Sequence, residues 1–329
     1  MKEKISNRVE VMGYLKENNL EMKATRNGGK SIQGSLTVAF SNLDSIRIDV
    51  YAEEKSAAKG TENKAYKSLS MLLPNATTSI KSQLESSPSA TFDTVKDVVT
   101  KISAHCELRE YAVRDENGKE STRVKVQLLN WFDSIHPANP AKPFEPGANF
   151  TIDAYIESIR PEMKAENGSD PEETGRYIVV GLTPDFTGAM QRISYVTEAG
   201  AVSEYISQNW KEGENTYFTG TIHNLMKMEQ KAGVTAGFGQ SAIGTVTTTF
   251  IDERLIRGGG QTTFDANDTG MEQAGFTSED VKKGLLLREE AIKKNTEKRL
   301  NKSTNTVAAP AQPQPTKDFG FGGFDPKGF

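Results

Sequence analysis

Short runs in which apolar and polar residues alternate, each ended by a turn signal, limit what this chain can fold into more than any other feature. The run RVEVMGYL places Val9 and Val11 on one face, because successive side chains of a strand point to opposite sides. The segments NGG (27–29) and NG (117–118) mark hairpin turns, since Asn and Gly tolerate a positive φ. The pattern predicts a mainly β protein with short antiparallel strands.

The order of the predicted elements narrows the fold further. Three strand-like runs are followed by a helical stretch over 61–86, broken at Pro74, and by a hairpin over 101–135. This is the element order of a five-stranded barrel of the OB type, although a sandwich or a split sheet would also fit. The second half repeats the order loosely, beginning with a strand that we expect to end at Pro161. We therefore predict OB-like five-stranded barrels, two in tandem, with minor α structure.

Changes in composition along the chain predict where the units end. Segment 136–147 contains four prolines, which is typical of an interdomain linker. Residues 276–300 have one apolar stripe and Thr277 or Ser278 as a cap, so they predict an amphipathic helix. The expected units are a first OB-like domain at 1–136, a Pro-rich linker at 137–147, a second OB-like domain at 148–262, a loop and amphipathic helix at 263–300, and a disordered tail at 301–329.

Charge and composition exclude several classes of protein. The formal net charge of −4 argues against coating of nucleic acid by bulk positive charge, so any such contact must come from a local groove. Cys106 is the single cysteine, and an intrachain disulfide is impossible. Because no run is long enough to cross a bilayer and the N-terminus lacks a signal-type apolar stretch, we expect a cytoplasmic protein without membrane contact.

Motifs for catalysis fail on inspection. The segment GKS (29–31) resembles the end of a phosphate-binding loop, but Ala24 stands where the motif needs glycine, and a strand follows instead of a helix. His105 and Cys106 are adjacent, yet only two further histidines exist, so a closed zinc site is not expected. The carboxylate-rich loops are typical of solvated surface. We expect no enzyme activity, no cofactor and no metal.

Binding of single-stranded nucleic acid does find support in the first half of the chain. It requires cations for phosphates and exposed aromatic faces on which bases stack. Arg109 and Tyr111 share one face of a predicted strand, as do Arg123 and Lys125. The candidate nucleic-acid-binding residues are Tyr14, Lys16, Arg26, Lys30, Arg47, Tyr51, Lys64, Tyr66, Lys67, Arg109, Tyr111, Arg123, Lys125 and Trp131.

Each of these residues also has a structural interpretation. Strands are rich in Tyr and surfaces in Lys for reasons of packing and solubility, and Trp131 is equally a candidate core residue. The second half offers fewer candidates, among them Arg254 and Arg257, which could line a groove or solubilise the end of a strand.

The chain ends in DFGFGGFDPKGF, after a Pro/Gln-rich run that cannot bury enough apolar surface to fold. Phe329 carries both a ring and the terminal carboxylate, which suits capture by a pocket beside a basic group. The predicted partner-binding tail residues are Phe319, Phe321, Phe324, Asp325 and Phe329.

The barrel-type strand order, the basic and aromatic face, the Pro/Gln spacer and the terminal phenylalanine together resemble bacteriophage-type single-stranded-DNA-binding proteins of the OB-fold family. The runs RVEVMGYL and SIRIDVYA look like the first strands of their domain. The resemblance implies a groove that coats and protects single-stranded DNA, largely without sequence preference, during phage DNA replication, recombination or repair in an infected bacterial cell. It also implies that the tail tip recruits replication or recombination proteins.

The tail departs from the family pattern because it is not acidic. Lys302, Lys317 and Lys327 oppose Asp318 and Asp325. This balance favours self-association of the aromatic tip with neighbouring molecules.

Alternative functions remain open from the sequence. The chain could be a structural or assembly protein, for instance a virion or scaffold component, whose barrels contact other proteins. An annealing recombinase would use the same groove, whereas a nuclease would need a metal-binding carboxylate cluster. Steep weakening of binding with salt distinguishes contact with phosphates from contact with protein. The choice between DNA and RNA and the oligomeric state also stay open.

Overall fold

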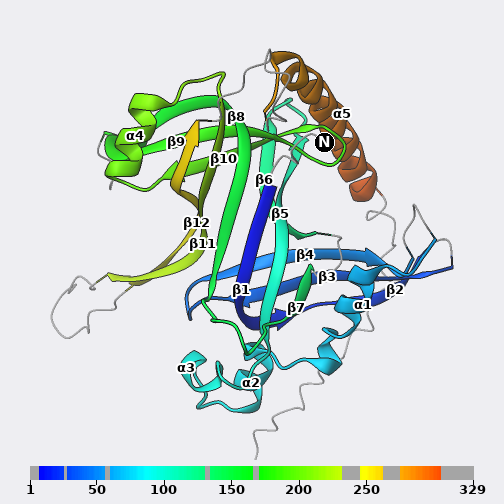
Figure 1. The fold of residues 1–329 in the computed structure, drawn as a ribbon. Coiled ribbons are helices and arrows are strands. Elements are labelled where there is room, and N and C mark those ends of the chain that lie inside the picture. Colours follow the sequence, from blue (N-terminus) through cyan, green and yellow to red (C-terminus); the bar gives the residue numbers. More distant parts are fainter. Residues whose placement is uncertain are drawn as a thin grey trace, which may run out of the picture.

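The computed structural model of the chain (Figure 1) describes residues 7–25, 28–55, 60–129, 134–165, 170–231, 245–261 and 275–304. Within these ranges the chain is mainly β, as the alternating pattern predicts. The predicted disordered tail lies outside the described residues, apart from its first few positions, which belong to a helix. No helix of the described residues is long and apolar enough to span a membrane.

Five strands close the first barrel: β1 (Asn7–Asn18), β3 (Lys30–Ala39), β4 (Ser45–Glu53), β5 (Lys101–Arg114) and β6 (Glu120–Leu128). β1 pairs with β3 and β3 with β4, β4 runs parallel to β6, and β6 pairs with β5, which returns to β1. Two short strands pair beside this ring: β2 (Glu21–Ala24) is antiparallel to β3, and β7 (Ile135–Pro137) is antiparallel to β5. This closed ring of pairings is the OB arrangement.

Short helices fill the connection between β4 and β5. They are α1 (Lys64–Ser70), the 3₁₀ turn η1 (Pro74–Ala76), α2 (Ile80–Ser86) and α3 (Phe92–Val95). The predicted break at Pro74 is present, because a proline ring cannot continue a helix but fits the first position of a new turn. The side chain of Asn63 caps α1 by accepting a hydrogen bond from the Ala65 N–H.

The second barrel repeats the ring with β8 (Gly147–Lys164), β9 (Glu172–Pro184), β10 (Met190–Thr197), β11 (Asn215–Lys231) and β12 (Thr245–Gln261). Pairing runs from β8 through β9, β10, β12 and β11 back to β8, and β10 and β12 are the parallel pair. Helix α4 (Ala201–Asn209) takes the place in the order that α1 to α3 take in the first barrel. The predicted fold class, two OB-like barrels in tandem, is confirmed.

One predicted strand end is wrong. We expected the first strand of the second barrel to end at Pro161, but β8 continues to Lys164 and pairs Pro161 with Tyr177. The register shifts between Pro161 and Met163. A bulge of this kind lets a strand pass a residue that has no N–H to donate.

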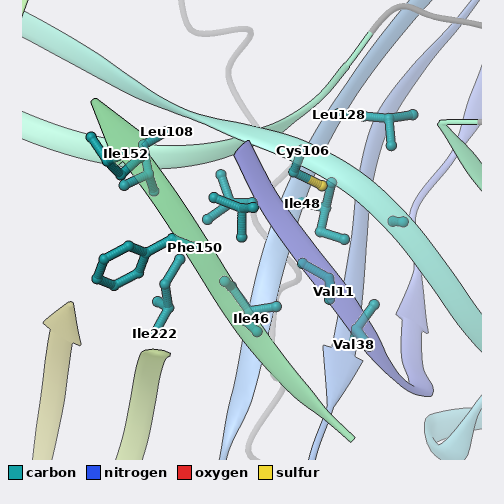
Figure 2. Close-up of a cluster of buried hydrophobic side chains, with 14 of the residues drawn as sticks. Val11, Val38, Ile46, Ile48, Cys106, Leu108, Leu128, Phe150, Ile152 and Ile222 are labelled. Carbon is teal, nitrogen blue, oxygen red and sulfur yellow. The ribbon is translucent and has the colours of Figure 1, made fainter. Parts of the chain in front are cut away.

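The two barrels share one sheet path and one core. β1 uses Asn7 to Met12 to pair with Gly147 to Ile152 of β8, in addition to its partners within the first barrel. Figure 2 shows Ile46 of the first barrel close to Phe150 and Ile222 of the second, and all three belong to the same buried cluster. The barrels are therefore packed against each other along this strand pair.

Helix α5 (Ser278–Thr304) spans both barrels. It begins after Thr277, whose hydroxyl accepts a hydrogen bond from the Asp280 N–H at 3.1 Å, so Thr277 is the cap that the sequence suggested. Phe276 and Val281 pack with Leu182 and Met190 of the second barrel. Further along, the helix lies against β5 of the first barrel, as Figure 1 shows.

A buried ion network fixes α5 to both barrels. Arg288 is 4% exposed and donates to the carboxylates of Glu110 and Glu120, with Nε 2.9 Å from Glu110 Oε2. Glu110 also accepts from the backbone N–H of Arg192 in β10, and its own N–H donates to Gln191. Arg288 thus joins the helix to β5 and β6, and Glu110 extends the network to β10.

Gly220 marks the tightest approach between strands of the second barrel. A Cβ at this position would lie 1.9 Å from the Leu255 carbonyl oxygen and 2.5 Å from the Phe150 ring. We expect Gly220→Ala to lower the free energy of unfolding by about 1–3 kcal/mol, because neither backbone nor packed ring can move away freely. Urea denaturation would measure the change, with Gly147→Ala as the control since no atom lies within 4 Å of its added Cβ.

Candidate nucleic-acid interface

Three cations lie side by side across the outer face of the first barrel. Arg47 and Lys125 each precede a residue of the parallel β4–β6 pairing, and Lys125 pairs directly with Arg109 of β5. The neighbouring residues Ile48, Val126 and Leu108 are buried in the barrel, so alternation turns the three cations outward. We call Arg47, Lys125 and Arg109 the cation row.

Carboxylates hold the cation row in place. Lys125 Nζ donates to Asp49 Oδ2 at 2.7 Å, and Arg47 Nε donates to Asp49 Oδ1 at 3.1 Å. Burial raises the pKa of Asp49, but hydrogen bonds and the charges of Lys125 and Arg47 outweigh it and lower the pKa below its usual value. Arg109 pairs with Glu107 at 2.8 Å. The row is thereby oriented before any ligand arrives.

A cleft of about 200 Å³ opens beside the row, between the two barrels. The lining residues are Ile46, Arg47, Asp49, Leu108, Arg123, Val124, Lys125 and Val126 from the first barrel and Ile222, Asn224, Asp252 and Arg254 from the second. Four cations face two carboxylates there, a formal excess of two positive charges in a chain whose net charge is −4. Arg123 is exposed and has no ion pair within the described part of the chain.

The cleft is formed where β4 and β6 separate and where the ends of β11 and β12 reach the first barrel. The β4–β6 pairing has only two residue pairs, so the strands separate beyond them. The far part of β11 and β12, which we call the arm (222–231 and 245–254), leaves the second barrel and reaches the β3–β4 turn. There Asp44 accepts from the Asn224 N–H at 3.1 Å and lies 3.0 Å from His223 Nδ1, while the Met226 N–H donates to the Leu43 carbonyl.

Exposed aromatic rings lie next to the cations of the row and of the cleft. Tyr111 of β5 lies beside Lys125, whose ammonium is 6.0 Å from the ring centre. Phe186, in the β9–β10 turn, is 80% exposed and has the Arg109 guanidinium 4.6 Å above one ring face. Phe250 is 70% exposed and alternates with the cleft residues Asp252 and Arg254 on one face of β12. These rings offer unpaired faces near the cations.

The structure brings together part of the set predicted from the sequence. Arg47, Arg109, Tyr111, Arg123 and Lys125 lie on the adjoining strands β4, β6 and β5. Tyr51 follows on the same face of β4, where it is half-exposed and its hydroxyl donates to Glu53. A hydrogen bond to Glu53 raises the pKa of this phenol.

Other predicted residues lie elsewhere in the first barrel. Tyr14 packs edge-on against Phe92 and Phe144, at ring distances of 5.6 and 5.1 Å, so both neighbours cover it. Lys16 lies 3.4 Å from the Ser45 hydroxyl at the start of β4. Tyr66 packs on the main core from α1.

The remaining predicted residues are exposed or outside the described structure. Lys30 begins β3, and Lys64 and Lys67 lie on α1, a helix that contacts β3 and β4. The predicted residues outside the described ranges are Arg26, Trp131, Phe319, Phe321, Phe324, Asp325 and Phe329.

Sequence reasoning missed the two exposed phenylalanines of the second barrel. The sequence pattern could have identified Phe250 as an exposed ring near a cation. In the run TFIDER, Phe250 shares a strand face with Asp252 and Arg254, just as Tyr111 shares one with Arg109. Phe186 stands in a four-residue turn, where a large apolar side chain is unusual. Neither pattern predicts that the ring lies next to cations of the first barrel.

Potential metal ligands do not gather among the described residues. No group of three or more His, Cys, Asp or Glu side chains in these ranges is placed to hold a metal ion. Cys106 is fully buried in the first barrel, and burial raises the pKa of its thiol.

Comparison with solved structures finds remote similarity along most of the chain. The crystal structure of the wild-type single-stranded DNA binding protein from Thermus aquaticus has a TM-score of 0.40 and 11% identity, covering 82% of this chain and 98% of that one. A deletion mutant of the same Thermus aquaticus protein gives a TM-score of 0.38 and 10% identity, covering 80% and 97%. These TM-scores and identities are too low to assign a function, so the function has to be inferred from the cleft of this chain itself.

Comparison with curated proteins and with protein families gives a clearer result for the family. No curated protein matches the chain. The YorF family model matches residues 5–298, which include both barrels and most of α5. The chain belongs to the YorF family.

Proposed function

We propose that this protein binds single-stranded DNA, largely without sequence preference, in the cleft between its barrels. The observation that carries the proposal is a local excess of positive charge, flanked by exposed rings, in a chain that is acidic as a whole. Such a site concentrates a polyanion at one place on a surface that otherwise repels it. Unpaired bases are needed because a duplex hides the faces on which rings stack.

The residues divide the work by their chemistry. Arg47, Arg123, Lys125 and Arg254 line the cleft and would hold phosphates through charge-assisted hydrogen bonds. Tyr111, Phe186 and Phe250 would stack bases along the rim. None of these contacts reads a base edge, which is why the proposed binding has little sequence preference.

The second barrel contributes the arm and the turn that carries Phe186 to the proposed site. It does not add a large cationic face of its own. Its arginines are largely neutralised: Arg176 contacts Glu162 and Glu253, and Arg192 pairs with Glu157. The first barrel supplies Arg47, Arg123 and Lys125, three of the four cations that line the cleft. We propose that the strand follows the cation row and passes under the arm.

The finer parts of the prediction enter here as proposals. The protein would coat and protect single-stranded DNA during phage replication, recombination or repair in the host cytoplasm, with the domain limits predicted above. Its tail, outside the described residues, would recruit replication or recombination proteins and support self-association. The candidate residues that lie away from the cleft, Lys30, Lys64 and Lys67, would extend the track toward α1.

Fluorescence anisotropy with labelled oligo-dT tests the proposal directly, against duplex DNA and single-stranded RNA, over a range of salt. We expect tight binding to single strands that weakens steeply with salt, because condensed counterions are released when phosphates are contacted. Absence of binding at low salt would refute the proposal and favour a structural or assembly role for the barrels. Equal binding to RNA would widen the proposed ligand from single-stranded DNA to single strands in general, because only a contact to the 2′-hydroxyl separates the two.

Removal of the exposed rings gives a separate prediction. We expect Phe250→Ala and Phe186→Ala each to weaken oligo-dT binding by about 1–3 kcal/mol, the usual contribution of one stacked base. Tyr205→Ala is the matched control, because Tyr205 is a half-exposed ring on α4, away from the cleft. Unchanged affinity in both phenylalanine variants would remove stacking on the second barrel from the mechanism.

A further inference from the structure

The outer part of the arm has little support from its own barrel. β11 pairs with β8 as far as Thr221, and β12 pairs with β10 at Leu255 and Ile256. Outside these paired stretches β11 and β12 pair with each other, and Figure 1 shows them leaving the second barrel as a two-stranded ribbon. A ribbon of this kind is at best marginally stable alone, so its position depends on contacts outside the second barrel.

Two contacts fix the base of the arm. Arg254 Nε donates to the Ser194 carbonyl of β10 at 2.9 Å. The Arg176 guanidinium of β9 donates to the Glu253 carboxylate, also at 2.9 Å. The arm is therefore held where it leaves the second barrel, and its outer part extends from that fixed base toward the first barrel.

Asp44 of the first barrel holds the outer part of the arm. It is 8% exposed, and the arm uses both of its carboxylate oxygens: Oδ1 accepts from the Asn224 N–H at 3.1 Å, and Oδ2 lies 3.0 Å from His223 Nδ1. A carboxylate only accepts, so His223 Nδ1 is the donor. Beside this contact the Met226 N–H donates to the Leu43 carbonyl at 2.9 Å. Hydrogen bonds to a charged group are the stronger kind, so the Asp44 side chain dominates this attachment.

Both sides of this attachment are themselves held in place. In the β3–β4 turn the Asp44 carbonyl accepts from the Phe40 N–H at 2.8 Å, and the Asp44 N–H donates to the Ser41 hydroxyl at 3.0 Å. On the arm, His223 Nε2 lies 2.9 Å from the hydroxyl of Thr221, which belongs to the part of β11 that pairs with β8. Asp44 thus joins a closed turn of the first barrel to an oriented imidazole of the arm.

The arm residues that contact Asp44 and Leu43 are the strand partners of the β12 segment that carries Phe250. Residues 223–226 of β11 pair in register with residues 253–250 of β12. In this segment Phe250 is exposed and Asp252 lines the cleft. We propose that Asp44 is a positioning residue: it holds the arm against the first barrel, so that Phe250 is in place to stack a base before a strand binds. The stacking part rests on the proposed function, whereas the hold on the arm does not.

Hydrogen–deuterium exchange of the full chain without DNA tests the hold on the arm. We expect Asp44→Ala to speed exchange about tenfold or more at the amides of 250–253, because loss of two hydrogen bonds to a charged group releases the ribbon as a whole. Both bonds go to β11, so a purely local loss would change exchange at 223–226 and leave β12 as it was. Asp44→Asn should restore part of the protection, since its amide oxygen still accepts one bond. Unchanged exchange at 101–108 in β5 would show that the first barrel is folded.

Asp115→Ala is the matched control for exchange. Asp115 lies in the β5–β6 turn of the first barrel, where its carboxylate accepts from the N–H groups of Asn117 and Lys119. Its loss therefore opens hydrogen bonds within its own turn and leaves the arm attached. Unchanged exchange at 250–253 in Asp44→Ala, or an equal increase in Asp115→Ala, would overturn the proposal.

A double-mutant cycle with oligo-dT tests the stacking part. We expect Phe250→Ala to weaken binding at least about fivefold in the natural protein and less than about twofold in Asp44→Ala, because a ring on a released arm no longer faces the cleft. Phe186→Ala, in the β9–β10 turn, should keep its full effect in both backgrounds. Equal effects of Phe250→Ala in both backgrounds would overturn the role of Asp44 in stacking. If neither the natural protein nor the variants bound DNA, the proposed function and the stacking role would fail together, while exchange would still decide whether Asp44 holds the arm.

Discussion

Replacing Arg47 and Arg123 by alanine together is expected to weaken binding to oligo-dT by roughly 100-fold at low salt. Each arginine lines the cleft, and a hydrogen bond to a charged group contributes about 1.5–3 kcal/mol, so each loss corresponds to about a tenfold change or more. Each lost phosphate contact also makes the dependence of log affinity on log salt shallower by about 0.7 for a single strand, or about 1.4 for two. Anisotropy titrations at several salt concentrations would measure both effects.

The control for this variant removes the same charge elsewhere on the first barrel. Lys81 and Lys96 lie on α2 and at the end of α3, where they form surface ion pairs with Glu17 and Asp93, respectively. We expect Lys81→Ala with Lys96→Ala to change neither the affinity nor the salt slope by a comparable amount. If both double variants weakened binding equally, long-range charge and not the cleft would be responsible, and the proposed site would be wrong.

Replacing Arg288 by methionine is expected to lower the free energy of unfolding by about 3–5 kcal/mol. Arg288 and Glu110 are almost fully buried, with side chains 5% and 4% exposed, and removal of one partner leaves an uncompensated charge in the interior. The same change would loosen α5 from β5, β6 and β10. Urea denaturation followed by circular dichroism would measure the loss.

Glu289→Gln provides the control for Arg288. Glu289, the next residue of α5, pairs with Arg114 of β5, but both side chains are a third or more exposed, and such surface pairs contribute about 0–1 kcal/mol. A loss of less than about 1 kcal/mol in Arg288→Met would show that the network is not what fastens the helix.

The pH dependence of stability in the natural protein and in Arg288→Met distinguishes loss of the ion network from loss of packing. A hydrogen bond from Arg288 lowers the pKa of Glu120 in the folded state. A carboxyl with a lowered folded pKa stabilises the fold above its unfolded pKa, and this stabilisation is lost as the pH falls through the folded value. We therefore expect the difference in stability between the natural protein and Arg288→Met to be constant above about pH 4.5, the ordinary pKa of a glutamate, and to shrink as the pH falls below it. A difference that stays constant at lower pH would indicate lost packing alone.

Local patterns predicted the barrels because each strand alternates with a period of two. The turn at 117–118, the break at Pro74 and the cap at Thr277 were likewise local, since each depends on a few neighbouring residues. Pro161 was the exception. Proline within a run usually ends a strand, but a bulge allowed β8 to continue, and bulges depend on the partner strand.

The candidate site was predictable only where one strand carried it. Alternation alone placed Arg109 with Tyr111 and Arg123 with Lys125. It could not place Tyr14, which alternates as an exposed residue would, yet lies under Phe92 and Phe144 from distant parts of the chain. Packing by segments far away in sequence decides whether a ring offers its face to solvent.

The sequence by itself determined the elements, their order, and which side chains share a strand face. Only the tertiary structure decided that Arg47 lies beside Lys125, through the parallel β4–β6 pairing, and that the arm brings Arg254 into the cleft beside the first barrel. The physical reason is that side-chain alternation follows from the geometry of one strand. The cleft depends on contacts such as Asp44 with Asn224, residues that 180 positions separate and only the folded core brings together.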